Sequence, residues 1–217
     1  KLSMVYNGCI YNYIDLRNKL IKKGHFFRTS GDTEVVLKSY LEWGEECVKF
    51  FEGDFAIAIW DNNRKRLFLF RDRFGVKPLY FTNSRNFFRF GSTLQSIIVN
   101  NDIDLALDEK SLHMHFSLHA VVPAPDTLFK NIKKVPPGCY LTIDENKKIS
   151  IIQYWKLESP EQKNIITNEN EATETIEYLL KESIEKRLSA SDIDVGVLLS
   201  GGLDSSMVVA LAKEKFP

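Results

Sequence analysis

Residues 54–75, DFAIAIWDNNRKRLFLFRDRFG, constrain the fold of this 217-residue chain more than any other stretch. Two apolar runs flank the polar residues 61–64, a pattern that is typical of a β-hairpin. Neighbouring residues of a strand point to opposite faces of its sheet, yet the run FAIAIW is apolar at every position. This strand therefore needs cover on both of its faces.

The segments before the hairpin predict two amphipathic helices. Residues 12–24 form the first, with Asn12 at its capping position and Gly24 at its end. Residues 33–44 repeat the helical spacing and end at Gly44. The apolar face of the first helix consists of Leu16, Leu20 and Ile21.

Short strands and loops fill the rest of residues 1–155. Residues 4–8 predict a strand that ends at the turn dipeptide Asn7–Gly8, and residues 26–30 are also strand-like. A second hairpin over 78–92, a helix over 111–119, and a Pro-punctuated loop followed by a strand over 121–143 come next. Antiparallel hairpins mixed with helices predict an α+β domain.

The composition changes after Trp155. Residues 156–170 are polar without periodicity and predict a linker. A helix over 171–188 and an apolar strand over 192–199 lead into a glycine turn and a second helix. Strand, tight turn and helix form the entry unit of a parallel α/β sheet.

Charge and cysteine content exclude several classes of protein. Lys plus Arg and Asp plus Glu balance at 29 each, which argues against binding to nucleic acid or to a membrane surface. Three widely spaced cysteines form no disulfide framework and fit a reducing compartment, and no apolar run is long enough to span a bilayer. We therefore expect a cytoplasmic protein that binds small molecules; its oligomeric state stays open, with a homodimer as one candidate.

The turn at residues 200–206 has the chemistry of an anion site. Two glycines let the backbone approach a ligand closely, and the following helix presents free N–H groups and a positive dipole end. Asp204 is placed either to bind Mg²⁺ or to cap the helix. A plain glycine-rich connection between strand and helix explains the same spacing equally well.

The motif LLSGGLDSS resembles the SGGxDS pyrophosphate loop of the ATP pyrophosphatase family, whose members adenylate a substrate and release pyrophosphate. The resemblance implies that ATP and Mg²⁺ bind here and that Leu199 borders the nucleotide. It also implies a cradle for the pyrophosphate that consists of Ser200, Gly201, Gly202, Asp204 and Ser205.

A second resemblance covers the first part of the chain. The segments MVYNGCIYNYIDLRNKLIKKGHFFRTSGDTEVVLKSYLEWGEECV, FAIAIWD, LFLFRDRFGVKPLY, VPAPDTLF and PPGCYL…YW resemble the glutamine-hydrolysing domain of asparagine synthetases, which are class II amidotransferases of the N-terminal-nucleophile type. This implies an α+β sandwich of αββα type with antiparallel sheets over 1–155. After a linker over 156–170, the first strand, loop and helix of an α/β ATP pyrophosphatase domain would occupy 171–217.

The resemblance also implies a glutamine site. The Asn7 side chain and the Gly8 N–H would form an oxyanion hole, and Asp32 would bind the α-amino group of glutamine. Together with Cys9 these residues make up the implied glutamine-binding set. Without the resemblance, Asn7–Gly8 is more simply an ordinary turn and Asp32 a helix cap.

The sequence departs from the family pattern in three places. The family nucleophile is an N-terminal Cys whose own amine acts as base, whereas this chain begins with Lys1 and also lacks the upstream Arg that clamps glutamine. Cys9 stands where the family has Glu, and Ser92–Thr93 stand where it has Ser–Glu, with no assigned effect. We interpret Cys9, Cys47 and Cys139 as small buried hydrophobic residues rather than substitute nucleophiles.

Two further groups have plain interpretations. The charged residues 71–78, RDRFGVKP, predict either a solvated loop or a contact with the second domain. The spacing of the histidines excludes a recognisable metal motif; they are His25, His113, His115 and His119.

The resemblance therefore implies a fragment of an ATP-dependent ligase. The parent enzyme would convert ATP, aspartate, glutamine and water to asparagine, glutamate, AMP and diphosphate, and the 217-residue chain alone would be inactive. One alternative is an amidotransferase of the same architecture that acts on a sugar acid or a peptide. The other is a non-catalytic regulatory relative, which Cys9 favours.

Overall fold

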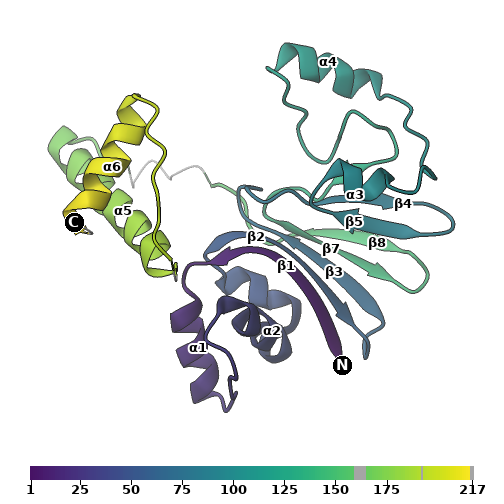
Figure 1. The fold of residues 1–217 in the computed structure, drawn as a ribbon, viewed down its shortest axis with the longest axis horizontal. Helices are drawn as coiled ribbons and strands as arrows, with labels where there is room; N and C mark the ends of the chain where they lie inside the picture. The colour runs from purple at the N-terminus through teal and green to yellow at the C-terminus, as the bar shows by residue number, and fades with distance from the viewer. Residues whose placement is uncertain (159–164, 192, 216–217) are drawn as a thin grey trace.

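The predicted hairpin forms the centre of a five-stranded antiparallel sheet (Figure 1). The structure is a computed structural model and describes residues 1–158, 165–191 and 193–215. The strand order is β1-β2-β3-β7-β8, and each neighbouring pair runs antiparallel. The strands are β1 (Leu2–Ile10), β2 (Gly53–Asp61), β3 (Arg66–Arg71), β7 (Cys139–Asp144) and β8 (Ile149–Gln153).

Strand β2 is covered on both faces, as its apolar sequence predicts. Phe55, Ile57 and Ile59 point toward the helices and are fully buried. Ala56 and Ala58 alternate with them, face the second sheet and are buried as well. The prediction from the run FAIAIW is confirmed.

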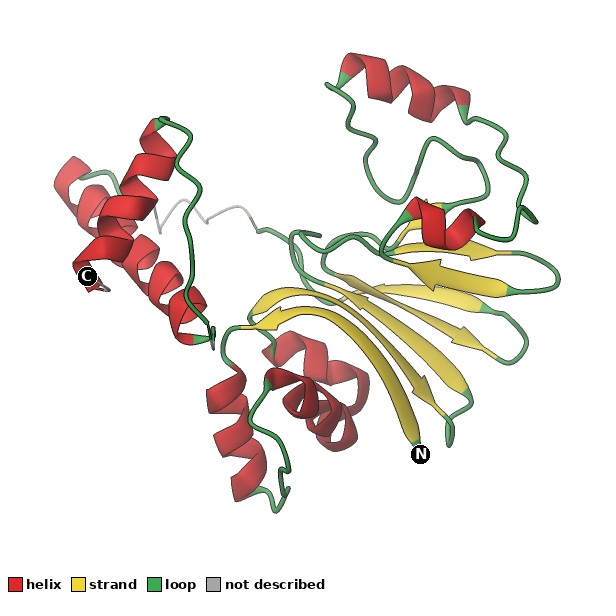
Figure 2. Ribbon diagram, viewed as in Figure 1, coloured by secondary structure: helices red, strands yellow, loops and turns green. Residues whose placement is uncertain are grey.

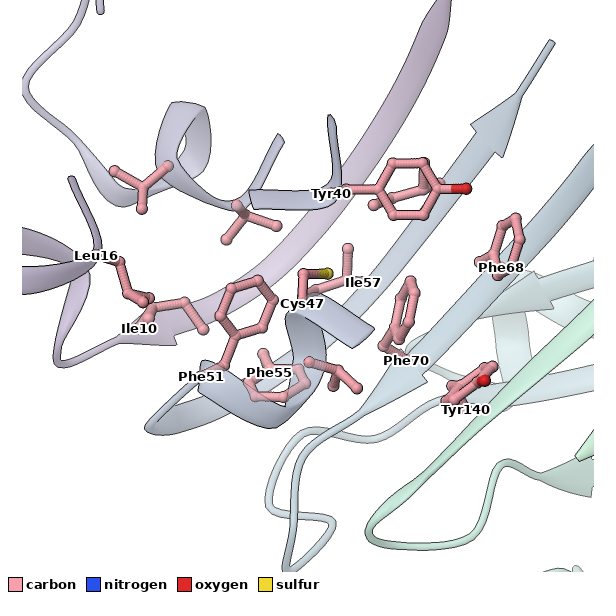
Figure 3. Close-up of a cluster of buried hydrophobic side chains, with 14 of the residues drawn as sticks. Ile10, Leu16, Tyr40, Cys47, Phe51, Phe55, Ile57, Phe68, Phe70 and Tyr140 are labelled. Atoms are coloured by element: carbon pink, nitrogen blue, oxygen red, sulfur yellow. The ribbon is translucent and has the colours of Figure 1, made fainter. Parts of the chain in front are cut away.

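Helices α1 (Tyr13–Lys22) and α2 (Asp32–Trp43) and the 3-10 helix η1 (Gly44–Phe50) cover one face of this sheet (Figure 3). Gly44 ends α2 with a positive φ of 58°, a conformation that favours glycine. Burial of each large apolar side chain here contributes about 1.5–3 kcal/mol. The largest of them are Ile10, Leu16, Leu20, Phe51, Phe55, Ile57, Ile59, Phe68 and Phe70.

A smaller sheet packs against the opposite face. Its strands are β5 (Phe88–Gly91), β4 (Tyr80–Asn83) and β6 (Lys133–Lys134), in that order, and β4–β5 is the predicted second hairpin. Helix α3 (Leu94–Ile98) contacts β4 and β5, and α4 (Glu109–Ser117) lies farther out on the same side (Figures 1 and 2). The layers are helices, sheet, sheet and helices, so the expected αββα sandwich is confirmed.

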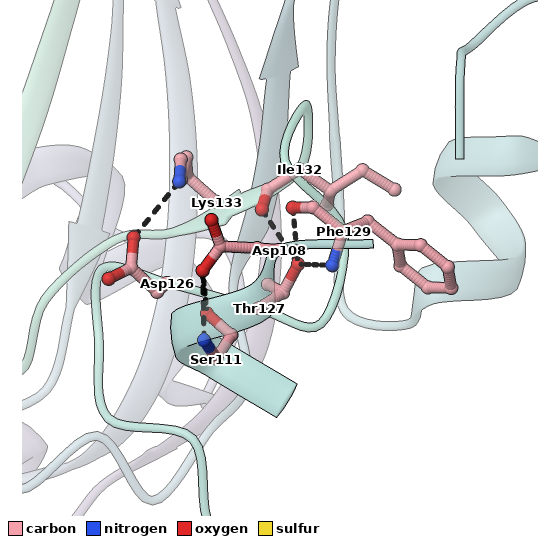
Figure 4. A network of polar contacts seen from close by, with 7 residues as sticks. All are labelled: Asp108, Ser111, Asp126, Thr127, Phe129, Ile132 and Lys133. Atoms are coloured by element: carbon pink, nitrogen blue, oxygen red, sulfur yellow. Dashed lines mark hydrogen bonds and ion pairs between the residues drawn. The ribbon is translucent and has the colours of Figure 1, made fainter. Parts of the chain in front are cut away.

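The Pro-punctuated loop before β7 is ordered by side-chain hydrogen bonds (Figure 4). Thr127 is buried, and its hydroxyl donates to the Phe129 and Ile132 carbonyls and accepts from the Phe129 N–H. Asp108 caps α4 by accepting from the Ser111 backbone at 2.9 Å. Thr82 of β4 joins the loop to the smaller sheet, because its hydroxyl donates to the Asn131 carbonyl at 2.8 Å.

Two local predictions near the N-terminus are wrong. The chain does not turn at Asn7–Gly8, because both residues pair with β2 and β1 continues to Ile10. Residues 26–30 form no strand, because the backbone N–H groups of Arg28 and Thr29 bond to the Glu34 carboxylate instead of to a neighbouring strand.

The first helix differs from its prediction in two side chains. Leu16 and Leu20 are buried as expected, whereas Ile21 is 51% exposed at the border of the apolar face. Asn12 stands at the N-cap position but makes no cap hydrogen bond. Its amide instead bonds to the Phe50 carbonyl and the Glu52 N–H, and so ties the end of β1 to the start of β2.

The C-terminal part contains α5 (Glu169–Ser189) and α6 (Leu203–Lys215), which pack together. The strand predicted over 192–199 does not form in residues 193–199, because no described segment lies beside it to complete a ladder. Its side chains are correspondingly exposed, among them Ile193, Val195, Val197, Leu198 and Leu199. Asp192 and residues 159–164 of the predicted linker lie outside the described residues.

Candidate functional site

The outer edge of β1 presents backbone N–H groups at alternate residues. The Tyr11 N–H donates to the Glu52 carbonyl at 2.7 Å, so odd-numbered residues of β1 face β2. The Ile10 N–H accordingly points the other way and donates to Asp32 at 3.0 Å. By the same alternation the Gly8 N–H lies on this edge, with which no described strand pairs.

Asp32 is held at this edge by two donors. One oxygen, Oδ2, accepts from the Tyr6 hydroxyl at 2.6 Å and from the Ile10 N–H at 3.0 Å. Burial, and then the hydrogen bond to Asp32, raise the pKa of Tyr6, so its hydroxyl stays protonated and donates. Among the described residues, Oδ1 is approached only by the Thr33 hydroxyl at 3.5 Å, which leaves it able to accept from an ammonium group.

The position of Asp32 in its helix corrects one sequence-based alternative. It is the first residue of α2, and the N-cap residue is Gly31, so Asp32 is not the cap. The loop that leads to Gly31 is fixed by Arg17, which donates to the Thr29 carbonyl at 2.7 Å and to the Gly31 carbonyl at 3.1 Å. The start of α2 is therefore positioned independently of any ligand.

Asn7 lies on the other face of β1, toward the smaller sheet. Its side-chain amide donates to the Ser92 hydroxyl at 3.4 Å, one residue beyond the end of β5. A cavity of about 260 Å³ opens beside it and is lined mainly by apolar residues; they include Val5, Ala56, Ala58, Leu79 and Phe90. One N–H of the amide is committed to Ser92, and the other can serve a ligand.

Gly8 is required by the close approach of two backbones. A Cβ atom at this position would lie 2.2 Å from the Asp54 carbonyl oxygen and 2.7 Å from Phe55 Cα. The same holds at Gly53, where a Cβ would lie 2.1 Å from the Cys9 carbonyl oxygen. These two glycines let β1 and β2 meet closely where the chain presents the Gly8 N–H.

Cys9 is half-buried and pairs with Asp54 of the neighbouring strand β2. It lies on the same face of β1 as Asn7, because it follows Asn7 by two residues. The other two thiols match their interpretation as buried hydrophobic residues, because Cys47 and Cys139 are 1% and 6% exposed. Burial raises the pKa of both thiols. A thiolate nucleophile is therefore disfavoured at either position.

For the charged segment 71–78, the solvated-loop alternative is wrong for its first two residues, which are buried. Asp72 is 1% exposed, and its carboxylate accepts from the backbone N–H groups of Phe55, Phe74, Val76 and Lys77. Arg71 is 8% exposed, donates to the carbonyls of Gly75, Lys77 and Val135, and has its pKa lowered by burial.

The next residues of that segment meet the second part of the chain, as the other alternative predicts. Arg73 and Phe74 line a cavity of about 290 Å³ together with residues of α5. Lys186 of α5 forms an ion pair with Glu52 at 2.9 Å, and the Arg187 guanidinium lies 4.7 Å from the centre of the Tyr11 ring.

The predicted nucleotide residues lie in the turn before α6 and in the first turn of that helix. The Ser200 and Ser205 hydroxyls lie 3.0 Å apart, and the Ser205 and Ser206 hydroxyls donate to the Gly202 carbonyl. Gly201 has a φ of 81°, which favours glycine. Leu199 precedes this turn and Asp204 lies in the first turn of the helix, where the positive dipole end and free N–H groups suit a phosphate.

No group of three or more His, Cys, Asp and Glu that could hold a metal ion occurs in the described part of the chain. Asp204, in the first turn of α6, carries a carboxylate of the kind that binds Mg²⁺, whose remaining ligands are commonly substrate phosphates and water. Within the same residues, no helix combines the length and apolar character needed to cross a bilayer.

The sequence profile described as "Glutamine amidotransferase domain" matches residues 1–155. The chain belongs to the glutamine amidotransferase domain family. A second profile, described as "Asparagine synthase", matches residues 175–217, which include α6 and the glycine turn. The amidotransferase domain is thus followed by the beginning of an asparagine synthase domain.

Curated relatives match nearly the whole chain. The chain is 37% identical over 214 residues to the glutamine-hydrolysing asparagine synthetase 3 of Bacillus subtilis strain 168. The match covers 99% of this chain and 34% of the relative. It is 37% identical over 213 residues to the putative glutamine-hydrolysing asparagine synthetase 2 of Methanocaldococcus jannaschii, covering 97% of this chain and 40% of the relative. The amidotransferase chain thus spans about a third of the length of the first of these.

A solved structure shares the fold. The structure titled as the allosteric regulatory enzyme of purine biosynthesis has a TM-score of 0.53 at 15% identity, and the match covers 97% of this chain and 43% of that one. The glutamine phosphoribosylpyrophosphate amidotransferase from B. subtilis gives a TM-score of 0.48 at 15% identity, with coverage of 98% and 44%.

Sequence reasoning about this amidotransferase chain missed two residues. Tyr6 holds Asp32, and the alternation of β1 could have indicated it, because Tyr6 shares with Leu2 and Met4 the face that packs on the helical core. Ser92 was left without an effect and contacts the Asn7 amide. Thr93 beside it caps α3 by accepting from the Ser96 N–H at 3.2 Å.

Proposed function

We propose that this chain is part of a glutamine-dependent asparagine synthetase. Its first domain would hydrolyse glutamine, and its second would use ATP to activate the side-chain carboxylate of aspartate for attack by the released ammonia. The products would be asparagine, glutamate, AMP and diphosphate. The observation that carries this proposal is the succession of the two family matches in one chain, over residues 1–155 and 175–217.

Asp32 would bind the α-ammonium group of glutamine. Its Oδ2 is already committed to Tyr6 and Ile10, which fixes the carboxylate, while Oδ1 can accept from the substrate. An Asp carboxylate and an ammonium group form a charge-assisted hydrogen bond, which is roughly twice as strong as a neutral one. The rigid placement of Asp32 favours orientation of the substrate along the open edge of β1.

Asn7 and Gly8 would stabilise the oxyanion. Amide hydrolysis through a thioester passes through a tetrahedral intermediate, whose negative oxygen needs fixed donors. The Gly8 N–H on the edge of β1 and the second amide N–H of Asn7 are two donors carried by adjacent residues of one strand. Cys9 completes the proposed set, at the position where the family has Glu.

The turn over residues 199–205 would hold ATP. Backbone N–H groups at the start of α6 and the Ser200 and Ser205 hydroxyls would surround the pyrophosphate, and Leu199 would border the nucleotide. Asp204 would supply a carboxylate to Mg²⁺, and the bound ion would supply positive charge that stabilises the diphosphate leaving group. We further propose that the enzyme acts in the cytoplasm, with a homodimer as the state to test.

The test is glutamine hydrolysis by the full-length gene product with Asp32→Asn and with the matched control Asp15→Asn, an acidic residue of the first turn of α1. Asp32→Asn should raise the KM for glutamine by at least about tenfold, because a charge-assisted hydrogen bond is worth about 1.5–3 kcal/mol. It should leave asparagine formation from ammonia unchanged. Equal glutamine KM values for the two variants would contradict the proposed site.

The 217-residue chain alone gives a second test. It should not hydrolyse glutamine, because the resemblance assigns the nucleophile to none of its own residues. Glutamine turnover by the purified chain would refute that assignment. For the full-length product, diphosphate release that requires a sugar acid or a peptide instead of aspartate would favour the alternative amidotransferase, and an absence of any release would favour a regulatory relative.

A further inference from the structure

Helix α5 contacts the two residues that flank the paired strands of the glutamine site, Tyr11 just after β1 and Glu52 just before β2. Its Lys186 ammonium forms an ion pair with Glu52 at 2.9 Å, and its Arg187 guanidinium lies over the Tyr11 ring at 4.7 Å. We call these four residues the latch. Figure 1 shows the C-terminal end of α5 beside the junction of β1 and α1.

The two contacted residues are themselves bonded to each other. The Tyr11 N–H donates to the Glu52 carbonyl at 2.7 Å, and the Tyr11 hydroxyl donates to Asp54 at 2.7 Å. The Asn12 amide accepts from the Glu52 N–H at 3.1 Å. Tyr11 and Glu52 therefore move as one unit, and two attachments to that unit fix the direction of α5 as well as its position.

This unit adjoins the proposed glutamine site directly. Ile10 precedes Tyr11, and its N–H holds the Asp32 carboxylate. Gly53 follows Glu52 and meets the Cys9 carbonyl so closely that no Cβ would fit between them. A displacement of Tyr11 and Glu52 is therefore transmitted within one or two residues to Asp32, Cys9 and the Gly8 N–H.

We propose that Lys186 and Arg187 are positioning residues for glutamine hydrolysis, supplied by the second domain to a site in the first. This inference rests on the proposed function. The latch holds the end of β1 so that Asp32 and the Gly8 N–H lie in register, which ties glutamine hydrolysis to the placement of α5. Neither residue touches the substrate; both act through Tyr11 and Glu52.

The test compares Lys186→Ala/Arg187→Ala with Lys181→Ala in the full-length gene product. Lys181 lies on the same helix, and its ion pairs among the described residues are with Glu177 and Glu214 of the second domain, so it is a matched control. Each latch contact is partly exposed, so the loss of either one should raise the KM for glutamine about two- to fivefold. The double variant should raise the KM for glutamine about tenfold and leave ammonia-dependent asparagine formation within about twofold of wild type.

Two variants of Tyr11 isolate the ring contact. Tyr11→Phe and Tyr11→Leu both remove the hydroxyl that donates to Asp54, but only Tyr11→Leu also removes the ring under Arg187. The KM for glutamine should therefore be higher in Tyr11→Leu than in Tyr11→Phe, and Arg187→Ala should raise it further in Tyr11→Phe but add little in Tyr11→Leu. An equal loss of glutamine- and ammonia-dependent synthesis in the double variant would overturn the proposal, because that pattern indicates simple domain packing. Kinetics equal to those of Lys181→Ala would overturn it as well.

A readout without turnover keeps the inference apart from the proposed function. Hydrogen exchange of the Ile10 amide, which is bonded to Asp32, should be at least about fivefold faster in the double variant than in Lys181→Ala. Unchanged exchange overturns the latch even if the enzyme makes asparagine. If the Ile10 amide exchanges faster but the protein makes no asparagine, the latch is supported and the proposed function is wrong.

Discussion

The replacement Gly8→Ala tests whether the glutamine-site strand is built on a close backbone approach. The added Cβ would lie 2.2 Å from the Asp54 carbonyl oxygen and 2.7 Å from Phe55 Cα, and both of these atoms belong to the backbone. A flexible side chain could swing aside, whereas here β1 and β2 must separate by roughly 1 Å. Overpacking of this kind costs about 1–3 kcal/mol, and each ladder hydrogen bond that it weakens costs about 1 kcal/mol more.

We therefore expect Gly8→Ala to lower the free energy of unfolding by about 3 kcal/mol, which corresponds to a fall in Tm of about 6–12 °C. Urea unfolding followed by tryptophan fluorescence would measure it, since Trp43, Trp60 and Trp155 all lie in the first domain. Gly31→Ala is the control, because a Cβ there meets nothing within 4 Å. Because Gly31 is the N-cap of α2, where alanine is disfavoured, its replacement should cost about 0.5–1 kcal/mol, well below the cost at Gly8.

Gly53→Ala should cost about as much as Gly8→Ala, because its Cβ would lie 2.1 Å from the Cys9 carbonyl oxygen on the same strand pair. The double replacement should cost less than the sum, since one separation of the strands relieves both clashes. A Gly8→Ala protein as stable as the Gly31→Ala control would refute the reasoning.

Three further predictions concern stability and reactivity. Asp72→Asn should destabilise the protein by about 2–4 kcal/mol in urea unfolding, because a buried carboxylate accepts from four backbone N–H groups; a change under 0.5 kcal/mol would contradict this. Hydrogen bonds from Lys23 and then His25 hold the pKa of Glu42 below its ordinary 4.5. The unfolded state therefore binds more protons, and the stabilisation is present above about pH 4.5 and lost as the pH falls. The Tm advantage of wild type over Glu42→Gln should accordingly shrink between about pH 5 and 3; a constant difference would argue against the shift. Burial raises the pKa of the Cys47 thiol, so it should react with a thiol reagent at pH 8 only after unfolding, and rapid labelling of the native protein would count against its burial.

The local sequence pattern predicted those parts of the fold that depend on the residues of a single segment. The run FAIAIW could only be a strand covered on both faces, and Gly44 ended a helix because the chain needs a positive φ there. Asn7–Gly8 misled because a turn dipeptide says nothing about long-range pairing, and here the glycine serves a close approach to Asp54 within a strand.

The candidate site was predictable as a set of residues but not as a geometry. Asp32 came from the resemblance, whereas its support by Tyr6 depends on residues 26 positions apart that only the packing of α2 on β1 brings together. The buried Asp72 could not be told from a solvated charge, because its four partners are backbone groups. Backbone partners leave no signature in the sequence.

The most direct test of the central claim is transfer of label from glutamine. The full-length gene product is incubated with glutamine carrying ¹⁵N in its side-chain amide, together with aspartate, ATP and Mg²⁺. The proposed function predicts ¹⁵N in the side-chain amide of asparagine, with one diphosphate released per asparagine. No labelled asparagine should form without aspartate or without ATP. Labelled ammonia without labelled asparagine, or asparagine formed only from added ammonium, would contradict the claim that the two domains form one glutamine-dependent synthetase.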